Sequence, residues 1–334
     1  MNEIETGKQV QRDEIAVIVP VYMGAEVLRE LCARLIATLQ PITSRFSIVL
    51  VDDRAPDNAW PIIADLCAGE PRIKGIQLSR NFGQHYALTA GIDHADARWY
   101  VVMDCDLQDA PEDIPLLYAK VLEGFDMAVA TRHKEGHGSL KRIGSRLFYS
   151  AFSMLAGFDM TWTVGNFRIF SSQIAEGFRE MREQMRCLPA SFSIMGFEVA
   201  EVELPHHPRL YGKSSYTLSK LVKLGGAMVL AHSQMPLKLA MFSGLAVAIL
   251  SMLAGLTIAI AAVFDVFLVT GWASLIVAIF AIGGIQIFIT GVVGIYVGKC
   301  FDEAKRRPLY FVRDLRNLTP TRDRIEKITF DFQR

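Results

Sequence analysis

Two aspartates and a glutamine stand at alternate positions in residues 104–108 and form the strongest candidate for chemistry in the sequence. Asp104, Asp106 and Gln108 follow an apolar run that is typical of a buried strand. Alternate residues of an extended segment point to one side, so we expect these three oxygen-bearing side chains to converge. Such ligands suit Mg²⁺ or Mn²⁺, which often complete their coordination with water and substrate phosphates. We therefore predict Asp104, Asp106 and Gln108 as metal ligands, with the ion neutralising a departing diphosphate.

A second candidate group is basic. It comprises Arg132, His133, Lys134, His137, Lys141, Arg142 and Arg146. A helix capped by Ser139 would place Lys141 and Ser145, and likewise Arg142 and Arg146, one turn apart on the same side. We predict that these pairs bind a lipid phosphate, because a guanidinium can hold its oxygens bidentately. The alternative is a solvated basic face that only meets anionic lipid head groups.

The elements that must position these residues alternate along the first ~130 residues between short β-rich runs and helical patterns. We expect strands at residues 15–21, 47–51, 73–78, 99–103 and 126–130, and helices at 26–39, 61–67 and 86–94. Near-continuous apolar strands separated by helices indicate a parallel sheet that is covered on both faces. Ligands of such sheets bind at the carboxyl ends of the strands, where Asp52, Asp53, Asp104 and Asp106 fall.

Two long uncharged runs lie in the last third of the chain. Residues 239–264 carry no charged side chain, and none follows Asp265 until Lys299. Each run exceeds the ~20 apolar residues needed to cross a hydrocarbon core, so we predict two transmembrane helices. The alternative for each is a long buried helix of a soluble protein. Just before them, residues 217–229 have an apolar stripe with lysines opposite, which favours an interfacial helix over the alternative of an ordinary core-facing helix.

The basic residues predict the orientation of the two spans. Lysines and arginines precede the first span and follow the second, whereas the link at 265–272 has neither. The positive-inside rule therefore predicts that both ends lie in the cytoplasm and the link outside. The expected location is the inner (cytoplasmic) membrane. The polar segment 1–14 shows no signal peptide. Small residues in the second span would let helices pack closely, so a homo-oligomer is also expected.

Composition limits the remaining classes. The 334 residues have a formal net charge of zero, which gives no global signal for nucleic acid. The five cysteines have no metal-like spacing and are expected to be reduced thiols. The histidine pairs His133/His137 and His206/His207 lack a third ligand at useful spacing, which argues against a zinc site.

Several motifs occur in a fixed order along nearly the whole chain. They are Val17-Ile18-Val19-Pro20-Val21-Tyr22, Val51-Asp52-Asp53, Leu78-Ser79-Arg80-Asn81-Phe82-Gly83-Gln84, Met103-Asp104-Cys105-Asp106-Leu107-Gln108-Asp109-Ala110-Pro111-Glu112, Gly165-Asn166-Phe167-Arg168 and Gly212-Lys213-Ser214-Ser215-Tyr216. With this series and the paired spans, the chain resembles a family 2 glycosyltransferase of the polyprenyl-phosphate type. Such enzymes include dolichyl-phosphate mannose synthases and bacterial transferases that load glucose or aminoarabinose onto undecaprenyl phosphate.

The resemblance implies a Rossmann-like GT-A α/β domain and a role for each motif. Pro20, Tyr22, Asp52 and Asp53 would border the base and ribose of the donor. Asn81, Gly83, Gln84 and Asp104 would lie along it. Asp104, Asp106 and Arg132 are the expected catalytic residues. The acceptor phosphate would meet Arg132, Lys141 and Ser145, joined by Arg142 and Arg146. The implied layout is a catalytic domain (1–215), an interfacial segment (216–236), two spans with an outside link (237–299) and a cytoplasmic tail (300–334).

The implied reaction is metal-dependent, inverting transfer of a sugar from a nucleotide-diphosphate sugar, expected to be a UDP-sugar, to undecaprenyl phosphate for cell-envelope glycan or lipopolysaccharide modification. The alternatives are a catalytically degenerate membrane scaffold and a transferase with another lipid or glycan acceptor. The chain departs from the family pattern at Met23-Gly24, at Arg54-Ala55, and at Thr163 and Asn166, where relatives often carry acids. These departures affect the sugar more than the reaction class. A processive synthase would also need a Q-x-x-R-W segment, which is absent.

Overall fold

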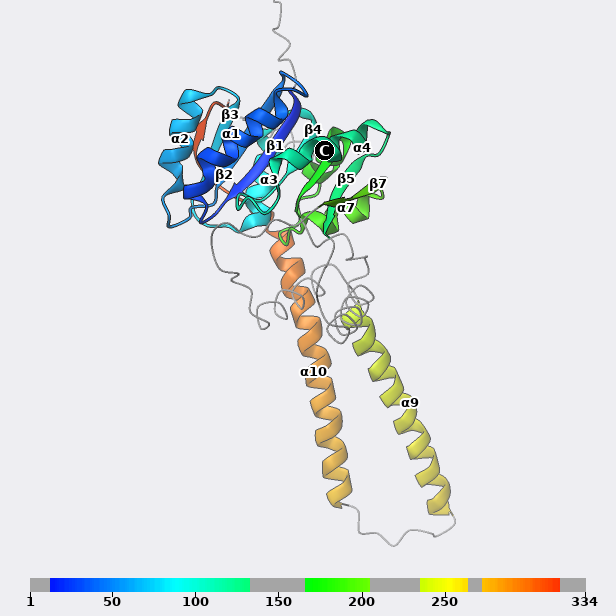
Figure 1. Cartoon of the computed structure of the whole chain (residues 1–334). Helices are drawn as coiled ribbons and strands as arrows, with labels where there is room; N and C mark the ends of the chain where they lie inside the picture. Colours follow the sequence, from blue (N-terminus) through cyan, green and yellow to red (C-terminus); the bar gives the residue numbers. More distant parts are fainter. Residues whose placement is uncertain (1–12, 133–165, 205–234, 264–271, 319–334) are drawn as a thin grey trace, which may run out of the picture. The chain divides into compact units, whose positions relative to one another are not determined.

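The computed structural model describes residues 13–132, 166–204, 235–263 and 272–318 (Figure 1). They fall into two compact units. The described residues of the first unit are 13–132, 166–204 and 308–318, and those of the second are 235–263 and 272–307. Each unit is considered by itself below.

The first unit is built on an eight-stranded sheet with the order β7-β5-β6-β4-β1-β2-β3-β8. The strands are β1 (Asp13–Val21), β2 (Phe46–Asp52), β3 (Ile73–Leu78), β4 (Ala97–Val102), β5 (Met127–Arg132), β6 (Arg168–Ser171), β7 (Val199–Leu204) and β8 (Val312–Arg316). The four central strands β4, β1, β2 and β3 are parallel, as are β5 and β7. β6 and β8 run antiparallel to their neighbours. The predicted α/β fold with a mostly parallel sheet is therefore confirmed.

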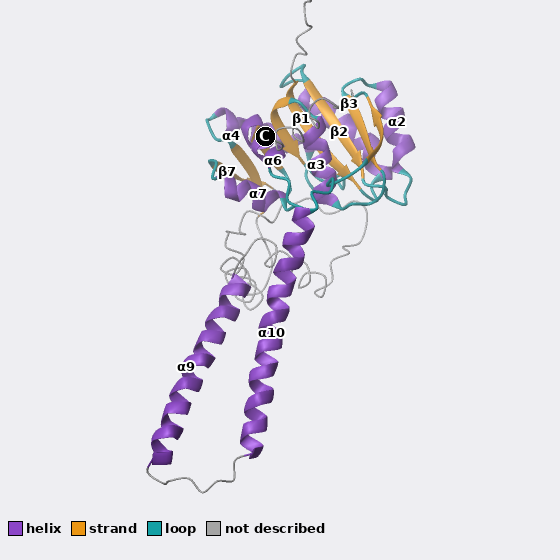
Figure 2. Ribbon diagram, turned by 180° about the vertical axis from the view of Figure 1, so that it is seen from behind, coloured by secondary structure: helices purple, strands orange, loops and turns teal. Residues whose placement is uncertain are grey.

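Helices cover both faces of this sheet. One face packs against α1 (Leu28–Leu39), α2 (Ala59–Gly69) and α4 (Ile114–Leu122), and short 3-10 turns at Ala25–Val27 and Pro111–Asp113 precede α1 and α4. The other face packs against α3 (Gln84–His94), α6 (Ser172–Glu180) and α7 (Leu188–Met195) (Figure 2). Strand alternation explains the division: in β1, Val17 and Val19 enter the first core and Ala16 and Ile18 the second. Each fully buried Val or Ile contributes about 1.5–3 kcal/mol.

The edge strand β8 was not among the strands expected from the sequence. It lies in the segment 300–334, which the sequence analysis treats as a tail, and it pairs antiparallel with β3 from Gly75 opposite Arg316. Asn317 fastens its end, because its Nδ2 donates to the Cys67 carbonyl at 2.6 Å and to the Ile73 carbonyl at 2.8 Å. Residues 308–318 thus belong to the sheet unit.

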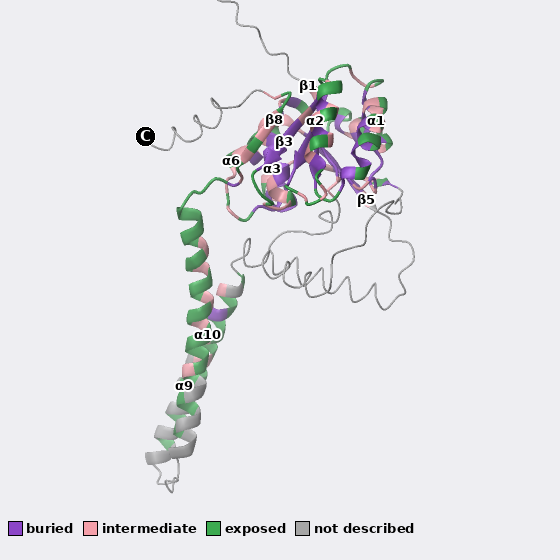
Figure 3. Ribbon diagram, turned by 90° about the vertical axis from the view of Figure 1, so that its left-hand side faces the viewer, coloured by how far each residue is buried: buried purple, intermediate pink, exposed green. Residues whose placement is uncertain are grey.

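The second unit contains two long helices, α9 (Met235–Val263) and α10 (Trp272–Ala304). Among the described residues, one stretch, Ile282–Ala304, is long and apolar enough to cross a membrane. Its large apolar side chains, such as Ile287 and Phe288, are exposed (Figure 3). The first predicted span falls within α9, where the apolar stretch Leu237–Ser251 is shorter. A pair of spans therefore remains a prediction, and most of the predicted interfacial segment lies outside the described residues.

Candidate active site

The sheet register brings the predicted acidic residues to one edge. β1 lies between β2 and β4, with Val21 opposite Asp52 and Ile18 opposite Val102. The backbone N–H of Asp53 then donates to the Val21 carbonyl at 3.1 Å. Asp104 follows two residues after the end of β4. The two acidic strand ends therefore flank the end of β1, as the predicted parallel sheet requires.

Asp53 organises the loop of residues 79–83, which connects β3 to α3. Its Oδ1 accepts from the backbone N–H of Phe82 at 2.7 Å, and its Oδ2 accepts from that of Gly83 at 2.8 Å. The Asp53 residue is 2% exposed. Burial raises the pKa of Asp53, and the two N–H donors partly oppose the rise. Asp53 therefore fixes the loop of residues 79–83, which contains the predicted sugar-donor-binding residues Asn81 and Gly83.

Asp104 is held by two side-chain amides. Gln84 Nε2 donates to Asp104 Oδ1 at 2.6 Å. Asn166 Nδ2 donates to Oδ1 at 3.2 Å and to Oδ2 at 3.5 Å. Because an amide N–H₂ can donate but not accept, the Asp104 carboxylate oxygens are the acceptors in both contacts. Asp104 is therefore oriented from two sides of the site, by the start of α3 and by the segment before β6.

A buried cation interacts electrostatically with this carboxylate. Arg168 is fully buried, and its Nε donates to the Asn166 carbonyl at 3.3 Å. Burial lowers the pKa of Arg168 to about 10, while the negative potentials of Cys187 and Asp104 oppose the fall. The guanidinium stays protonated near neutral pH. It therefore adds a buried positive charge that interacts with the Asp104 carboxylate.

The segment that carries the predicted metal ligands turns instead of staying extended. Leu107 has φ 57°, in the left-handed region, and the backbone N–H of Gln108 folds back to Asp106 Oδ1 at 3.2 Å. The expectation of an extended segment is wrong, because the chain must turn after β4 to reach α4. The alternation survives in burial: Cys105 and Leu107 are buried, whereas Asp104, Asp106 and Gln108 are partly exposed.

The donor set fits a hard divalent cation. Within the described ranges, no three His, Cys, Asp or Glu side chains gather as a metal site. The predicted set has two carboxylates and one amide oxygen, which leaves most of the coordination to water or substrate phosphate. Mg²⁺ is commonly bound in this way beside phosphates.

The remaining predicted donor residues differ in exposure. Pro20 is buried, whereas Tyr22 and Asn81 are exposed. Asp52 is 3% exposed, and its Oδ2 accepts from Gln77 Nε2 at 2.9 Å. Its Oδ1 is buried and has no hydrogen-bond partner among the described residues. A buried acceptor of this kind is costly unless a donor reaches it, so a bound hydroxyl or N–H group would satisfy it.

The predicted acceptor-phosphate group cannot be placed. Lys141, Arg142, Ser145 and Arg146 lie outside the described residues. Arg132 is described only through its backbone, at the end of β5. These residues remain predictions.

Sequence reasoning missed the roles of Asn166 and Arg168. It treated Asn166 as a departure from an acidic pattern, and Arg168 as a motif match without a function. The signal available was their place just before and within a short apolar run. Because β6 runs antiparallel to β4, with Val102 opposite Arg168, the start of β6 lies beside the end of β4.

Comparisons with known proteins place the chain among glycosyltransferases. The sequence model of Glycosyl transferase family 2 matches residues 16–199. The chain is 33% identical to the uncharacterized glycosyltransferase YkcC of Bacillus subtilis, over 90% of this chain and 93% of that one. It is 29% identical to the undecaprenyl-phosphate 4-deoxy-4-formamido-L-arabinose transferase of Shewanella sediminis, over 91% and 92% of the two chains. It is 31% identical to the bactoprenol glucosyl transferase of Shigella phage SfV, over 90% and 98%.

Proposed function

Because the chain belongs to glycosyl transferase family 2 and is an enzyme of that family, we propose that it transfers a sugar from a nucleotide-diphosphate donor to polyprenyl phosphate at the cytoplasmic face of a membrane. The observation that carries the proposal is the hydrogen bonding of Gln84 and Asn166 to Asp104. It orients a carboxylate at the edge of the sheet where α/β folds bind nucleotides.

The acceptor class is supported by two relatives whose names differ in the sugar but share the lipid. One acts on undecaprenyl phosphate with a formamido-arabinose, and the other is named for glucose and bactoprenol. Both match about nine-tenths of this chain, beyond the sheet unit and into the long helices. This chain departs from the family pattern mainly around the predicted donor loops. Such a pattern fits an acceptor that is shared with these relatives and a sugar that differs among them. We propose undecaprenyl phosphate as the acceptor and a UDP-sugar as the donor.

The chemistry assigned to this chain is positioning and charge balance. Asp53 fixes the loop 79–83 along the donor, and Gln84 with Asn166 fixes Asp104. Asp104, Asp106 and Gln108 would hold Mg²⁺ or Mn²⁺, which when bound supplies positive charge to the departing diphosphate. We assign the acceptor phosphate to Arg132, Lys141, Arg142, Ser145 and Arg146.

The acceptor needs no strong general base, because a polyprenyl phosphate is already an anion near neutral pH. Its oxygen forms a bond to the anomeric carbon while the bond from that carbon to the diphosphate oxygen breaks. Both electrons of that bond leave with the diphosphate, and one direct displacement inverts the sugar. The protein lowers the barrier of this step mainly by holding the two anions in line and balancing their charge.

The membrane assignment follows from α10 and from the charge pattern. The stretch Ile282–Ala304 supplies one candidate span, and we propose a second within α9. Basic residues before the first and after the second would keep both ends in the cytoplasm. With this orientation the sheet unit would face the cytoplasm, where nucleotide sugars are made.

Membranes containing the protein test the proposal when incubated with labelled nucleotide sugars and polyprenyl phosphate. We expect label from one donor to enter the lipid fraction with the wild-type chain and not with Asp106→Asn. Label in a water-soluble product, with none in lipid, would refute the acceptor. No transfer from any donor would refute the function.

A further inference from the structure

Two consecutive residues of the C-terminal segment contact the two ends of α3. Tyr310 OH donates to Asp93 Oδ2 at 2.8 Å, in the last turn of the helix. The Phe311 carbonyl accepts from the backbone N–H of Ser79 at 2.8 Å. The Phe311 ring lies 6.3 Å from that of Phe82, just before the helix begins. Residues 310 and 311 therefore brace the last turn of α3 and the loop that precedes this helix.

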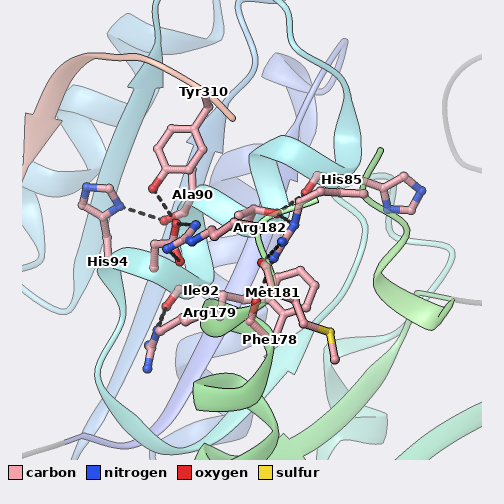
Figure 4. A network of polar contacts seen from close by, with 12 residues as sticks. His85, Ala90, Ile92, His94, Phe178, Arg179, Met181, Arg182 and Tyr310 are labelled. Carbon is pink, nitrogen blue, oxygen red and sulfur yellow. Dashed lines mark hydrogen bonds and ion pairs between the residues drawn. The ribbon is translucent and has the colours of Figure 1, made fainter. Parts of the chain in front are cut away.

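At the Asp93 end of this brace, three hydrogen bonds hold the carboxylate. Arg182 donates to both Asp93 oxygens, at 2.8 Å and 3.1 Å, and the Asp93 side chain is only 9% exposed. Tyr310 and Arg182 point toward one another around this turn (Figure 4). Burial, joined by the Asp93 carboxylate, raises the pKa of Tyr310 well above its ordinary value, so the hydroxyl stays a donor. A bidentate ion pair with an added hydroxyl is a strong, oriented contact.

The other end of α3 and the loop before it carry the hydrogen-bond donors that hold Asp53 and Asp104. The N–H groups of Phe82 and Gly83 donate to Asp53, and Gln84, the first residue of α3, donates to Asp104. A shift of α3 along its axis or a change in the 79–83 loop would move all of these donors at once. Phe311 contacts this loop directly, through Ser79 and Phe82.

We propose that Tyr310 and Phe311 are positioning residues for the transfer reaction, holding the 79–83 loop and the start of α3 where they orient Asp53 and Asp104. This inference rests on the proposed function. It gives the segment after α10 a task in donor binding, although it lies more than 200 residues downstream of the loop that it holds.

Hydrogen exchange of the full-length protein in detergent tests the brace directly. Phe311→Ala should speed exchange of the backbone amides in residues 79–84, while Phe311→Leu should restore most of the protection. Arg313→Ala is the matched control, because Arg313 is an exposed neighbour on β8. It should leave exchange in 79–84 unchanged. Tyr310→Phe, which removes only the hydroxyl bound to Asp93, should speed exchange at 92–94 and, less strongly, at 79–84.

Steady-state kinetics separate positioning from mere structure. Loss of one aromatic contact should raise the KM for the donor sugar roughly two- to tenfold in Phe311→Ala, with kcat and the KM for the lipid nearly unchanged. Unchanged exchange in 79–84, or faster exchange with an unchanged donor KM, would overturn the inference. A wild-type protein that transfers no sugar would count against the proposed function, whereas the exchange comparison would still decide whether the brace exists.

Discussion

The Asn166 side-chain amide donates to Asp104 across the boundary between β6 and β4, at 3.2 Å to one carboxylate oxygen and 3.5 Å to the other. The sequence pattern presents Asn166 as a missing acid. The structure shows instead that a carboxylate at this position would face another carboxylate at hydrogen-bond distance. The amide donates to both carboxylate oxygens and orients Asp104, and the buried Arg168 interacts electrostatically with the same carboxylate.

Asn166→Asp should therefore lower turnover by roughly tenfold or more at pH 7 and move the acidic limb of the pH–rate profile to higher pH. Two carboxylates in one site retain a proton more tightly than one alone. Asn166→Ala, which removes the donor without adding charge, should lower turnover less and leave the profile in place. Identical profiles for the two variants would contradict this explanation.

Gly24 and Cys105 should show strong coupling. A Cβ added at Gly24 would lie 2.6 Å from the Cys105 Sγ and 3.5 Å from its Cβ. Gly24→Ala should therefore displace the 104–108 turn, destabilise the fold by about 1–3 kcal/mol and reduce transfer. Cys105→Ala removes the clashing sulfur, so the double variant should recover stability and activity. Thermal melting and transfer rates of both single variants and the double variant check this, and additive losses would refute it.

The Cys105 thiol should be unreactive toward alkylating reagents, although it lies between Asp104 and Asp106 in the sequence. Burial raises the pKa of its thiol to about 11, and the neighbouring Asp104 and Asp106 add to the rise. At pH 7.5 the thiol is protonated and buried, and only thiolates react readily. We expect iodoacetamide to leave Cys105 unmodified, as mass spectrometry of the peptide would show. Rapid alkylation of Cys105 in the folded protein would contradict the burial.

Asp53 should give a distinct pH dependence of stability. Its pKa is raised in the folded protein, so the folded state holds the proton more tightly than the unfolded state does. Its stabilising contribution is present below the ordinary value of 3.8 and is lost as pH rises through the raised pKa. The free energy of unfolding of the wild type, minus that of Asp53→Asn, should fall as pH increases from about 4. A difference in the free energy of unfolding that rises with pH over this range would contradict the prediction.

Local pattern predicted the central strands well. The expected strands at 15–21, 47–51 and 73–78 correspond to Asp13–Val21, Phe46–Asp52 and Ile73–Leu78, because buried parallel strands are near-continuous apolar runs. β8 was missed for the converse reason. Its sequence Val312–Arg316 is mostly charged, and it forms a strand only because the open edge of β3 offers backbone partners.

The site was predictable in outline but not in its contacts. The order of strands and acids placed Asp53 and Asp104 at one edge, since parallel strands end together. The donors to Asp104 depend on β6 returning antiparallel beside β4, which no local pattern encodes. Two residues that depart from the family pattern also have an unusual backbone conformation. Met23 and Arg54 adopt φ of 58° and 55°, in the left-handed region that most residues with side chains disfavour.

The central claim is that the turn carrying Asp106 and Gln108 is where the donor diphosphate is held and released. The most direct test is the initial rate of sugar transfer to polyprenyl phosphate by Asp106→Ala and Gln108→Ala at saturating Mn²⁺, with circular dichroism confirming the fold. We predict that both variants keep the wild-type spectrum and lose transfer strongly, by roughly a hundredfold or more for Asp106→Ala. Near-normal rates in both folded variants would show that the chemistry lies elsewhere.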